Sequence, residues 1–259
     1  MKKLLLLGLF FLTACQPPSN SQTATPKPTS TPAVTTTRFI PTPVPATATE
    51  TLTPPPTFTP EPPPRFFTEE FDSTPVYWST LYASGDPGRV EILNNDSALT
   101  FEIYSPNAWT YAIYGAQEYD TVHIETSVKS TGNDNNYVGL ICSYDEQEGW
   151  FEFNISSDGT YSLLYGQWLA DGIANYMPIA DGPSEYINVG NTANELGLEC
   201  LNGVLQLFIN GQLFRKIDVS RFELSGGKVG LAVASFDKLP VILAFDWVKV
   251  GQSGGNGEN

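Results

Sequence analysis

From Phe66 onward, apolar and polar residues alternate in short runs separated by turn-forming residues. The run 122–128 shows the pattern, because its even-numbered residues are Val, Ile, Thr and Val while its odd-numbered residues are His, Glu and Ser. A period of two places successive side chains on opposite faces of a sheet and is typical of half-buried β-strands. No stretch keeps a helical period over several turns, so the pattern predicts an all-β domain.

Short Gly-containing turns join many of these runs. Asn202-Gly203 and Asn210-Gly211 each separate two alternating segments, which predicts a meander of three antiparallel strands. Ser156–Gly159 likewise predicts a hairpin turn. Between residues 167 and 191 the alternation breaks down, and we expect an irregular stretch of functional surface there.

The first 64 residues have a different composition. Of the 49 residues from Gln16 to Pro64, 29 are Pro or Thr, which provide little apolar surface for a core. We therefore predict a signal peptide over 1–14, a lipid-bearing cysteine and disordered Thr/Pro-rich linker over 15–64, a β-domain over 65–250, and a flexible tail over 251–259. At 186 residues the β-domain is long enough to bury one sizeable core.

The N-terminus has the parts of an export signal. Lys2-Lys3 precedes an apolar run, Leu4–Leu12, which is too short to span a bilayer. Thr13 and Ala14 follow this run and directly precede Cys15, and the arrangement resembles the lipobox of bacterial lipoproteins. That resemblance implies lipidation of Cys15 and anchoring to the outer face of a bacterial membrane, at the cell surface or in the periplasm.

The whole chain carries a formal net charge of −15. No basic stripe interrupts this acidic balance, and an acidic surface repels phosphate backbones. Nucleic acid is therefore excluded as an expected partner, and so is membrane binding that depends on a polybasic patch.

The cysteine count supports export. If Cys15 carries a lipid, Cys142 and Cys200 remain as an even pair in an oxidising compartment. Each cysteine shares a strand face with the apolar residues two and four positions before it. We predict a Cys142–Cys200 disulfide, with two separate buried thiols as the alternative.

Three stretches give a more specific indication of the fold. Leu196–Gly211, Lys228–Phe236 and Ala244–Val250 resemble the last strands of concanavalin A-like domains of the laminin G and glucanase types. Phe71-Asp72 fits the entry strand of such domains. The resemblance covers nearly all of Arg65–Val250 and implies a two-sheet antiparallel jelly-roll sandwich.

The sequence lacks the catalytic motif of the glucanases, although other sugar-cleaving relatives of the fold arrange their residues differently. Glucanases of this fold carry Glu-x-Asp-x-x-Glu on one strand; Glu70-Phe-Asp72 begins that pattern, but the next residues depart from it. Asp145–Glu148 holds three carboxylates in a predicted turn, where solvated acids are common. His123 is the single histidine, which gives neither a zinc site nor a triad signature.

Aromatic residues are the strongest candidates for contact with a ligand, because pyranose rings stack on flat side chains. The alternative is that these rings are buried against the sandwich. We expect Trp78 and Trp247 in the core. The candidate ligand-binding residues are Trp168, Tyr176, Trp150 and Trp109.

Calcium is the one metal that the sequence suggests. Asp134, Asn136 and Asp145 offer hard oxygen ligands near the two ends of one predicted strand, and related domains often bind calcium. No EF-hand spacing is present, and Asn- and Asp-rich loops also form ordinary turns.

These observations predict a lipid-anchored, exported, non-catalytic binding module for a glycan or another cell-surface ligand. The first alternative is a saccharide-acting hydrolase of the concanavalin A-like glucanase type. The second is a domain that binds protein through a sheet face.

Overall fold

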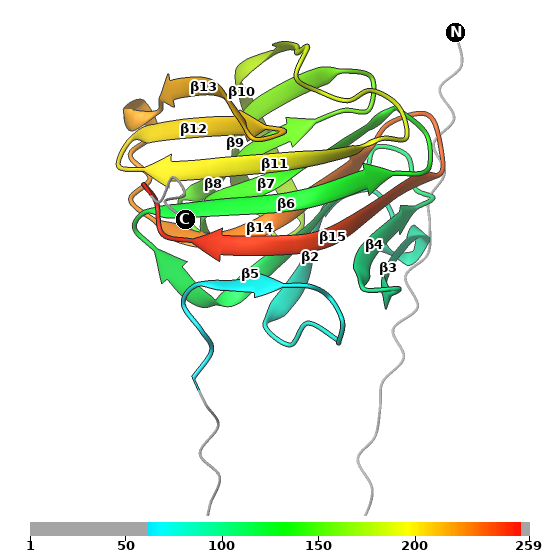
Figure 1. Cartoon of the computed structure of the whole chain (residues 1–259), viewed down its shortest axis with the longest axis horizontal. Coiled ribbons are helices and arrows are strands. Elements are labelled where there is room, and N and C mark those ends of the chain that lie inside the picture. The colour runs from blue at the N-terminus through cyan, green and yellow to red at the C-terminus, as the bar shows by residue number, and fades with distance from the viewer. Residues whose placement is uncertain (1–61, 255–259) are drawn as a thin grey trace, which may run out of the picture. The chain divides into compact units, whose positions relative to one another are not determined.

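The computed structural model describes residues 62–254, in which two antiparallel β-sheets pack face to face (Figure 1). The two-sheet sandwich predicted from the alternation is confirmed. Helical structure among these residues is limited to two single turns, Pro87–Arg89 and Ser220–Phe222. Neither turn is long or apolar enough to cross a membrane. The predicted signal peptide, Cys15, nearly all of the linker and the end of the tail lie outside the described residues.

One sheet has eight strands and forms the front layer in Figure 1. Its order is β13-β12-β11-β6-β15-β4-β3, and the short strand β1 pairs with β15 beside that path. The bounds are β1 Phe67–Glu69, β3 Val90–Asn95, β4 Ala98–Ile103, β6 Val122–Ser130, β11 Ala193–Leu201, β12 Val204–Ile209, β13 Gln212–Asp218 and β15 Val241–Gly251.

The second sheet has seven strands in the order β10-β9-β8-β7-β14-β5-β2. Both sheets interleave strands from distant parts of the chain, as a jelly roll requires. The bounds are β2 Trp78–Ser84, β5 Trp109–Tyr119, β7 Asn136–Asp145, β8 Gly149–Ile155, β9 Thr160–Ala170, β10 Ile173–Pro183 and β14 Gly227–Ser235.

The main core fills the space between the sheets. Alternate residues of each strand point inward, so Ile124 and Val128 of β6 are buried while His123 and Glu125 face outward. The core also contains Cys142 of β7 and Cys200 of β11, whose Cα atoms lie 6.5 Å apart and which form a disulfide. The predicted pairing is confirmed, and it joins the two sheets covalently.

The predicted turns are also present. Asn202-Gly203 and Asn210-Gly211 connect β11, β12 and β13, and Ser156–Gly159 connects β8 to β9. The expectation of an irregular stretch over 167–191 is partly wrong, because β9 and β10 form a long hairpin through residue 183. Register shifts at residues 173–174 and 178–180 interrupt the pairing, which explains why simple alternation fails there.

Candidate functional site

The β9–β10 hairpin bends over the outer face of the seven-stranded sheet. β10 and β2 are opposite edges of this sheet, yet residues of the two strands approach each other. A Cβ atom added to Gly172, at the hairpin tip, would lie 3.7 Å from the carbonyl oxygen of Tyr82 in β2. The hairpin therefore covers the sheet face that points away from the main core.

Six aromatic side chains fill the space beneath this hairpin, and we call them the aromatic cluster. Trp109 of β5 stacks on Tyr176 of β10 with 4.6 Å between ring centroids. Trp150 of β8 lies 5.1 Å from the ring of Trp168 in β9. The cluster consists of Trp109, Tyr111, Tyr144, Trp150, Trp168 and Tyr176.

All four aromatic residues predicted to bind a ligand belong to the aromatic cluster. Trp150 is completely buried, whereas Trp109, Trp168 and Tyr176 are partly exposed. Trp168 Nε1 donates a hydrogen bond to the Tyr144 hydroxyl at 3.1 Å. In this structure the rings pack on one another, so their role in binding a ligand stays a prediction.

A carboxylate lies at the centre of the aromatic cluster. Glu152 of β8 has no exposed surface, because the hairpin closes over it. Its Oε2 accepts hydrogen bonds of 3.1 Å from the Tyr111 hydroxyl and from Trp150 Nε1. Its Oε1 accepts a 2.7 Å bond from Asn154 Nδ2. The Tyr176 hydroxyl hydrogen-bonds that of Tyr111 and extends the network into the hairpin.

This environment changes the acidity of Glu152. Burial raises the pKa of the Glu152 carboxyl to about 7, although the hydrogen bonds from Asn154, Trp150 and Tyr111 oppose the shift. Burial and the adjacent Glu152 carboxylate both raise the pKa of Tyr111 well above its usual value. Tyr111 therefore remains a hydrogen-bond donor, and Glu152 exchanges a proton near neutral pH.

Asn154 can serve both protonation states of Glu152. Its Oδ1 is buried and has no hydrogen-bond partner, while its Nδ2 donates to the carboxylate. A half-turn of the amide would direct Oδ1 toward Glu152, where it would accept the proton of the neutral acid. The Asn154 amide can thus form a hydrogen bond with Glu152 whether the carboxyl is ionised or neutral.

Gly166 of β9 makes room for the indole ring that holds Glu152. A Cβ atom at this position would lie 2.3 Å from Cε2 of Trp150 and 2.7 Å from its Nε1. We expect Gly166→Ala to lower the free energy of unfolding by about 1–3 kcal/mol, because the ring must shift away. Chemical denaturation measures the change. Gly115→Ala is the control, since its new Cβ would lie 3.7 Å from the nearest atom, the Tyr77 carbonyl oxygen; equal losses in both variants would contradict the proposed clash.

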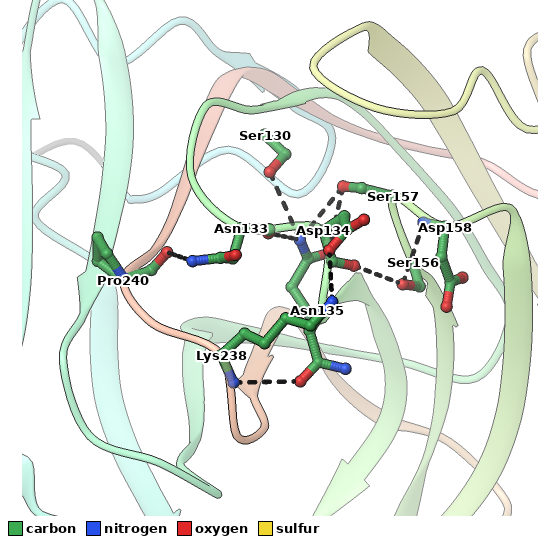
Figure 2. Close-up of polar contacts among 10 residues, drawn as sticks. Ser130, Asn133, Asp134, Asn135, Ser156, Ser157, Asp158, Lys238 and Pro240 are labelled. Carbon is green, nitrogen blue, oxygen red and sulfur yellow. Dashed lines mark hydrogen bonds and ion pairs between the residues drawn. The ribbon is translucent and has the colours of Figure 1, made fainter.

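The residues predicted to bind calcium do not come together. Asp134 and Asn136 lie at the start of β7 and Asp145 at its end, which separates Asn136 from Asp145 by about 30 Å of strand. Asn136 Nδ2 donates to the Asn133 carbonyl and to Ser157, and Asp134 pairs with Lys238 at 3.7 Å. Figure 2 shows hydrogen bonds that join the loop before β7 to the β8–β9 turn and to the segment 238–240. Residues 62–254 contain no group of three His, Cys, Asp or Glu side chains that could hold a metal ion, and the three predicted ligands do not lie together.

The other polar candidates have local roles. Asp145 Oδ1 accepts hydrogen bonds from the backbone N–H groups of Gln147 and Glu148, which closes the β7–β8 turn. His123 Nε2 lies 2.8 Å from Glu125 Oε1 on the outer face of the eight-stranded sheet, far from Glu152 in the topology.

No family model matches this chain, and no curated protein sequence matches it. Solved structures do share its fold. A Bacteroides ovatus GH16 protein from a mixed-linkage glucan utilisation locus, in complex with a G4G4G3G product, has a TM-score of 0.53 and 13% identity over 71% of this chain and 99% of its own. The Bacillus licheniformis β-glucanase has a TM-score of 0.51 and 14% identity over 72% and 98%. At these identities the similarity establishes the concanavalin A-like jelly-roll fold.

These comparisons correct the functional prediction. Several similar structures with a TM-score of 0.5 or more are named as endo-glucanases, laminarinases or glycoside hydrolases. One is the Thermotoga maritima laminarinase catalytic domain at 0.50, with 12% identity over 71% of this chain and 96% of its own. The prediction of a non-catalytic binding module is contradicted, and its alternative, a saccharide-acting hydrolase, is better supported.

Sequence reasoning did not find Glu152. Glu152 belongs neither to a spaced carboxylate motif nor to the acidic turn before β8. A usable signal was present, since Trp150, Glu152 and Asn154 alternate with Phe151, Phe153 and Ile155. One face of this strand is therefore wholly apolar, while the other face carries an acid and an amide. If other elements cover both faces, such a strand holds a buried polar site.

Proposed function

We propose that this protein is a glycoside hydrolase in which Glu152 donates a proton to the glycosidic oxygen. The observation that carries the proposal is a fully buried carboxyl with a pKa raised to about 7, held by three hydrogen-bond donors among aromatic rings. A carboxyl that is partly protonated at neutral pH is suited to general acid catalysis on a glycosidic oxygen. The jelly-roll fold shared with several glucan-cleaving enzymes supports the same substrate class.

The chemistry needs one water molecule for each bond cleaved. Neutral Glu152 gives its proton to the glycosidic oxygen while the bond from the anomeric carbon to that oxygen breaks. Water then adds to the anomeric carbon, and its released proton returns to the Glu152 carboxylate. The products are two saccharides with new hydroxyl groups, and the enzyme regains its initial protonation state.

The neighbouring side chains have defined tasks in this scheme. Trp150 and Asn154 orient the carboxyl through its two oxygens, and the Tyr111 hydroxyl stabilises the ionised form. Many glycosidases use two carboxylates about 5–9.5 Å apart. Within residues 62–254, Glu152 is the one carboxylate hydrogen-bonded into the aromatic cluster, and its polar neighbours are the Tyr111 hydroxyl, the Trp150 indole N–H and the Asn154 amide.

Substrate must displace the hairpin tip to reach Glu152. Leu169 and Ile173 at the tip are exposed and so contribute little packing energy to the closed position. Lifting the tip would uncover the faces of Trp109 and Trp168, on which pyranose rings can stack. Loops that close over substrate in this way also exclude water from the reacting groups.

The test is hydrolysis of mixed-linkage, β-1,3- and β-1,4-glucans, measured as release of reducing sugar by the full chain. We expect Glu152→Gln to lower kcat/KM by about a hundredfold, because an amide cannot donate an acidic proton. Glu148→Gln, an exposed change in the turn before β8, is the matched control and should keep wild-type activity. Absence of hydrolysis by the wild type, or full activity of Glu152→Gln, would refute the proposal.

We further infer that the enzyme is exported and anchored through a lipid on Cys15. Support comes from the charged, apolar and small residues before Cys15 and from the Thr/Pro-rich segment that follows. Cys15→Ser should move the protein from the membrane fraction to the soluble exported fraction. Continued retention of the variant in the membrane fraction would contradict the anchor proposal. Formation of the Cys142–Cys200 disulfide in the variant serves as the control for correct folding.

A further inference from the structure

A groove of about 450 Å³ lies on the outer face of the eight-stranded sheet, on the opposite side of the sandwich from Glu152. Strands β6, β11, β12 and β15 form its floor and sides, and these strands lie side by side in Figure 1. Phe208 of β12 and Trp247 of β15 supply its aromatic surface. Trp247 was expected in the core, but a register shift between residues 245 and 247 leaves it half-buried on this outer face.

The middle of the groove is a glycine between two glutamates of one strand. Glu195, Gly197 and Glu199 alternate along β11 and therefore share its outer face. A Cβ atom on Gly197 would lie 3.1 Å from Cβ of Phe208 and 3.5 Å from Cε1 of His123. The missing side chain thus leaves the hollow between the two carboxylates.

The groove carries more negative charge than its basic residues neutralise. Glu125 is paired on both oxygens, with His123 at 2.8 Å and Lys249 at 3.7 Å, and the hydrogen bond from His123 lowers its pKa. Neither Glu195 nor Glu199 forms an ion pair within residues 62–254. Two carboxylates at the ends of the groove are therefore without a countercharge in this part of the chain.

Glu199 is the more informative of the two, because it is 94% buried. Its residue exposure is 6%, and its Oε1 accepts a hydrogen bond from the backbone N–H of Gly254. Its Oε2 has no hydrogen-bond partner among the described residues, and the side chain lines the groove. This oxygen is not closed off from solvent, so a cation that enters the groove can pair with it.

The geometry points to a linear diamine or polyamine as the ligand of this groove. A metal ion does not fit, since residues 62–254 contain no suitable group of three ligands. Glu195 and Glu199 are four residues apart on a strand, which places their Cα atoms about 13 Å apart. Two ammonium groups can pair with these carboxylates while the methylene chain between them crosses Gly197 and packs on Phe208.

This inference is independent of the proposed hydrolase activity. It concerns the opposite sheet and uses none of the residues around Glu152. Its driving forces are two charge-assisted hydrogen bonds and the burial of methylene groups on an aromatic ring. Because both carboxylates lie partly in solvent contact through the groove, added salt should weaken the binding.

Calorimetric titration of the full chain tests the proposal with a series of α,ω-diamines, spermidine, pentylamine and calcium chloride as probes. We expect saturable binding of one diamine or polyamine per chain, with pentylamine about tenfold weaker because it makes one charged contact fewer. Glu195→Gln and Glu199→Gln should each weaken diamine binding about tenfold, and Glu185→Gln, an exposed change outside the groove, should not.

Circular dichroism and thermal melting establish that each variant is folded before its titration is read. If Glu199→Gln does not fold, the ratio of diamine to pentylamine affinity for the wild type and for Glu195→Gln decides the question alone. Equal affinity for pentylamine and diamines, binding of calcium in place of amines, or tighter binding of a lysine-containing peptide than of any diamine would each overturn the assignment.

Discussion

Replacing both Cys142 and Cys200 with Ala is expected to lower the free energy of unfolding by about 4 kcal/mol, the value for a crosslink that closes a loop of this length. The two residues are 58 positions apart, and their bond connects β7 of one sheet to β11 of the other. Without it, the unfolded chain gains the conformational freedom of that whole loop. Urea unfolding followed by tryptophan fluorescence measures the difference in midpoint and slope.

The substitution also removes two buried sulfur atoms, so a control must separate crosslinking from packing. The wild-type chain unfolded in the presence of a reductant keeps both sulfurs and loses only the bond. We expect reduction alone to account for most of the loss. A double variant as stable as the oxidised wild type would show that the bond contributes no net stability.

The stability of the wild-type domain is expected to fall by about 3 kcal/mol as pH rises from about 4.5 to about 7, through Glu152 alone. The folded-state pKa of Glu152 is about 7, above the value of 4.5 for an exposed glutamate. The folded protein therefore binds this proton more tightly than the unfolded chain does. Its stabilising effect is fully present below pH 4.5 and is lost as the carboxyl ionises in its buried position.

Glu152→Gln removes this titration while it keeps the size of the side chain. Its stability should therefore exceed that of the wild type above pH 7, and the difference should shrink toward pH 4.5. Unfolding measured by denaturant at several pH values gives the comparison, with Glu148→Gln as an exposed control. Parallel pH profiles for Glu152→Gln and the wild type would contradict a buried, proton-exchanging carboxyl.

The two experiments on Glu152 are complementary. A stabilised but inactive Glu152→Gln variant would show the exchange of stability for activity that buried catalytic acids often display. A stabilised variant with unchanged activity would assign Glu152 to the interior of the fold alone. The proton equilibrium of Glu152 and its role in hydrolysis can thus be judged separately.

Most of the strands and the Asn-Gly turns could be predicted from the amino-acid sequence, with β10 as an exception. Alternation in 122–128, the two Asn-Gly turns after β11 and β12, and the matching positions of Cys142 and Cys200 depend on local geometry, which a single strand already specifies. The strand pattern and the concanavalin A-like resemblance predicted the sandwich, and the disulfide was predicted with two separate thiols as the alternative. The lipid-bearing Cys15 remains a prediction, because it lies outside the described residues.

The buried carboxyl of Glu152 could be recognised only from the tertiary structure. Alternation shows which residues share a strand face, but not whether a second element covers that face. The β9–β10 hairpin covers Glu152, and this burial raises the pKa of the Glu152 carboxyl. The same hairpin places Tyr176 of β10 against Trp109 of β5. The groove around Gly197 likewise depends on strands from three separate parts of the chain, β6, the β11–β12 hairpin and β15. Contacts across such distances are set by sheet order and strand curvature, which no local pattern records.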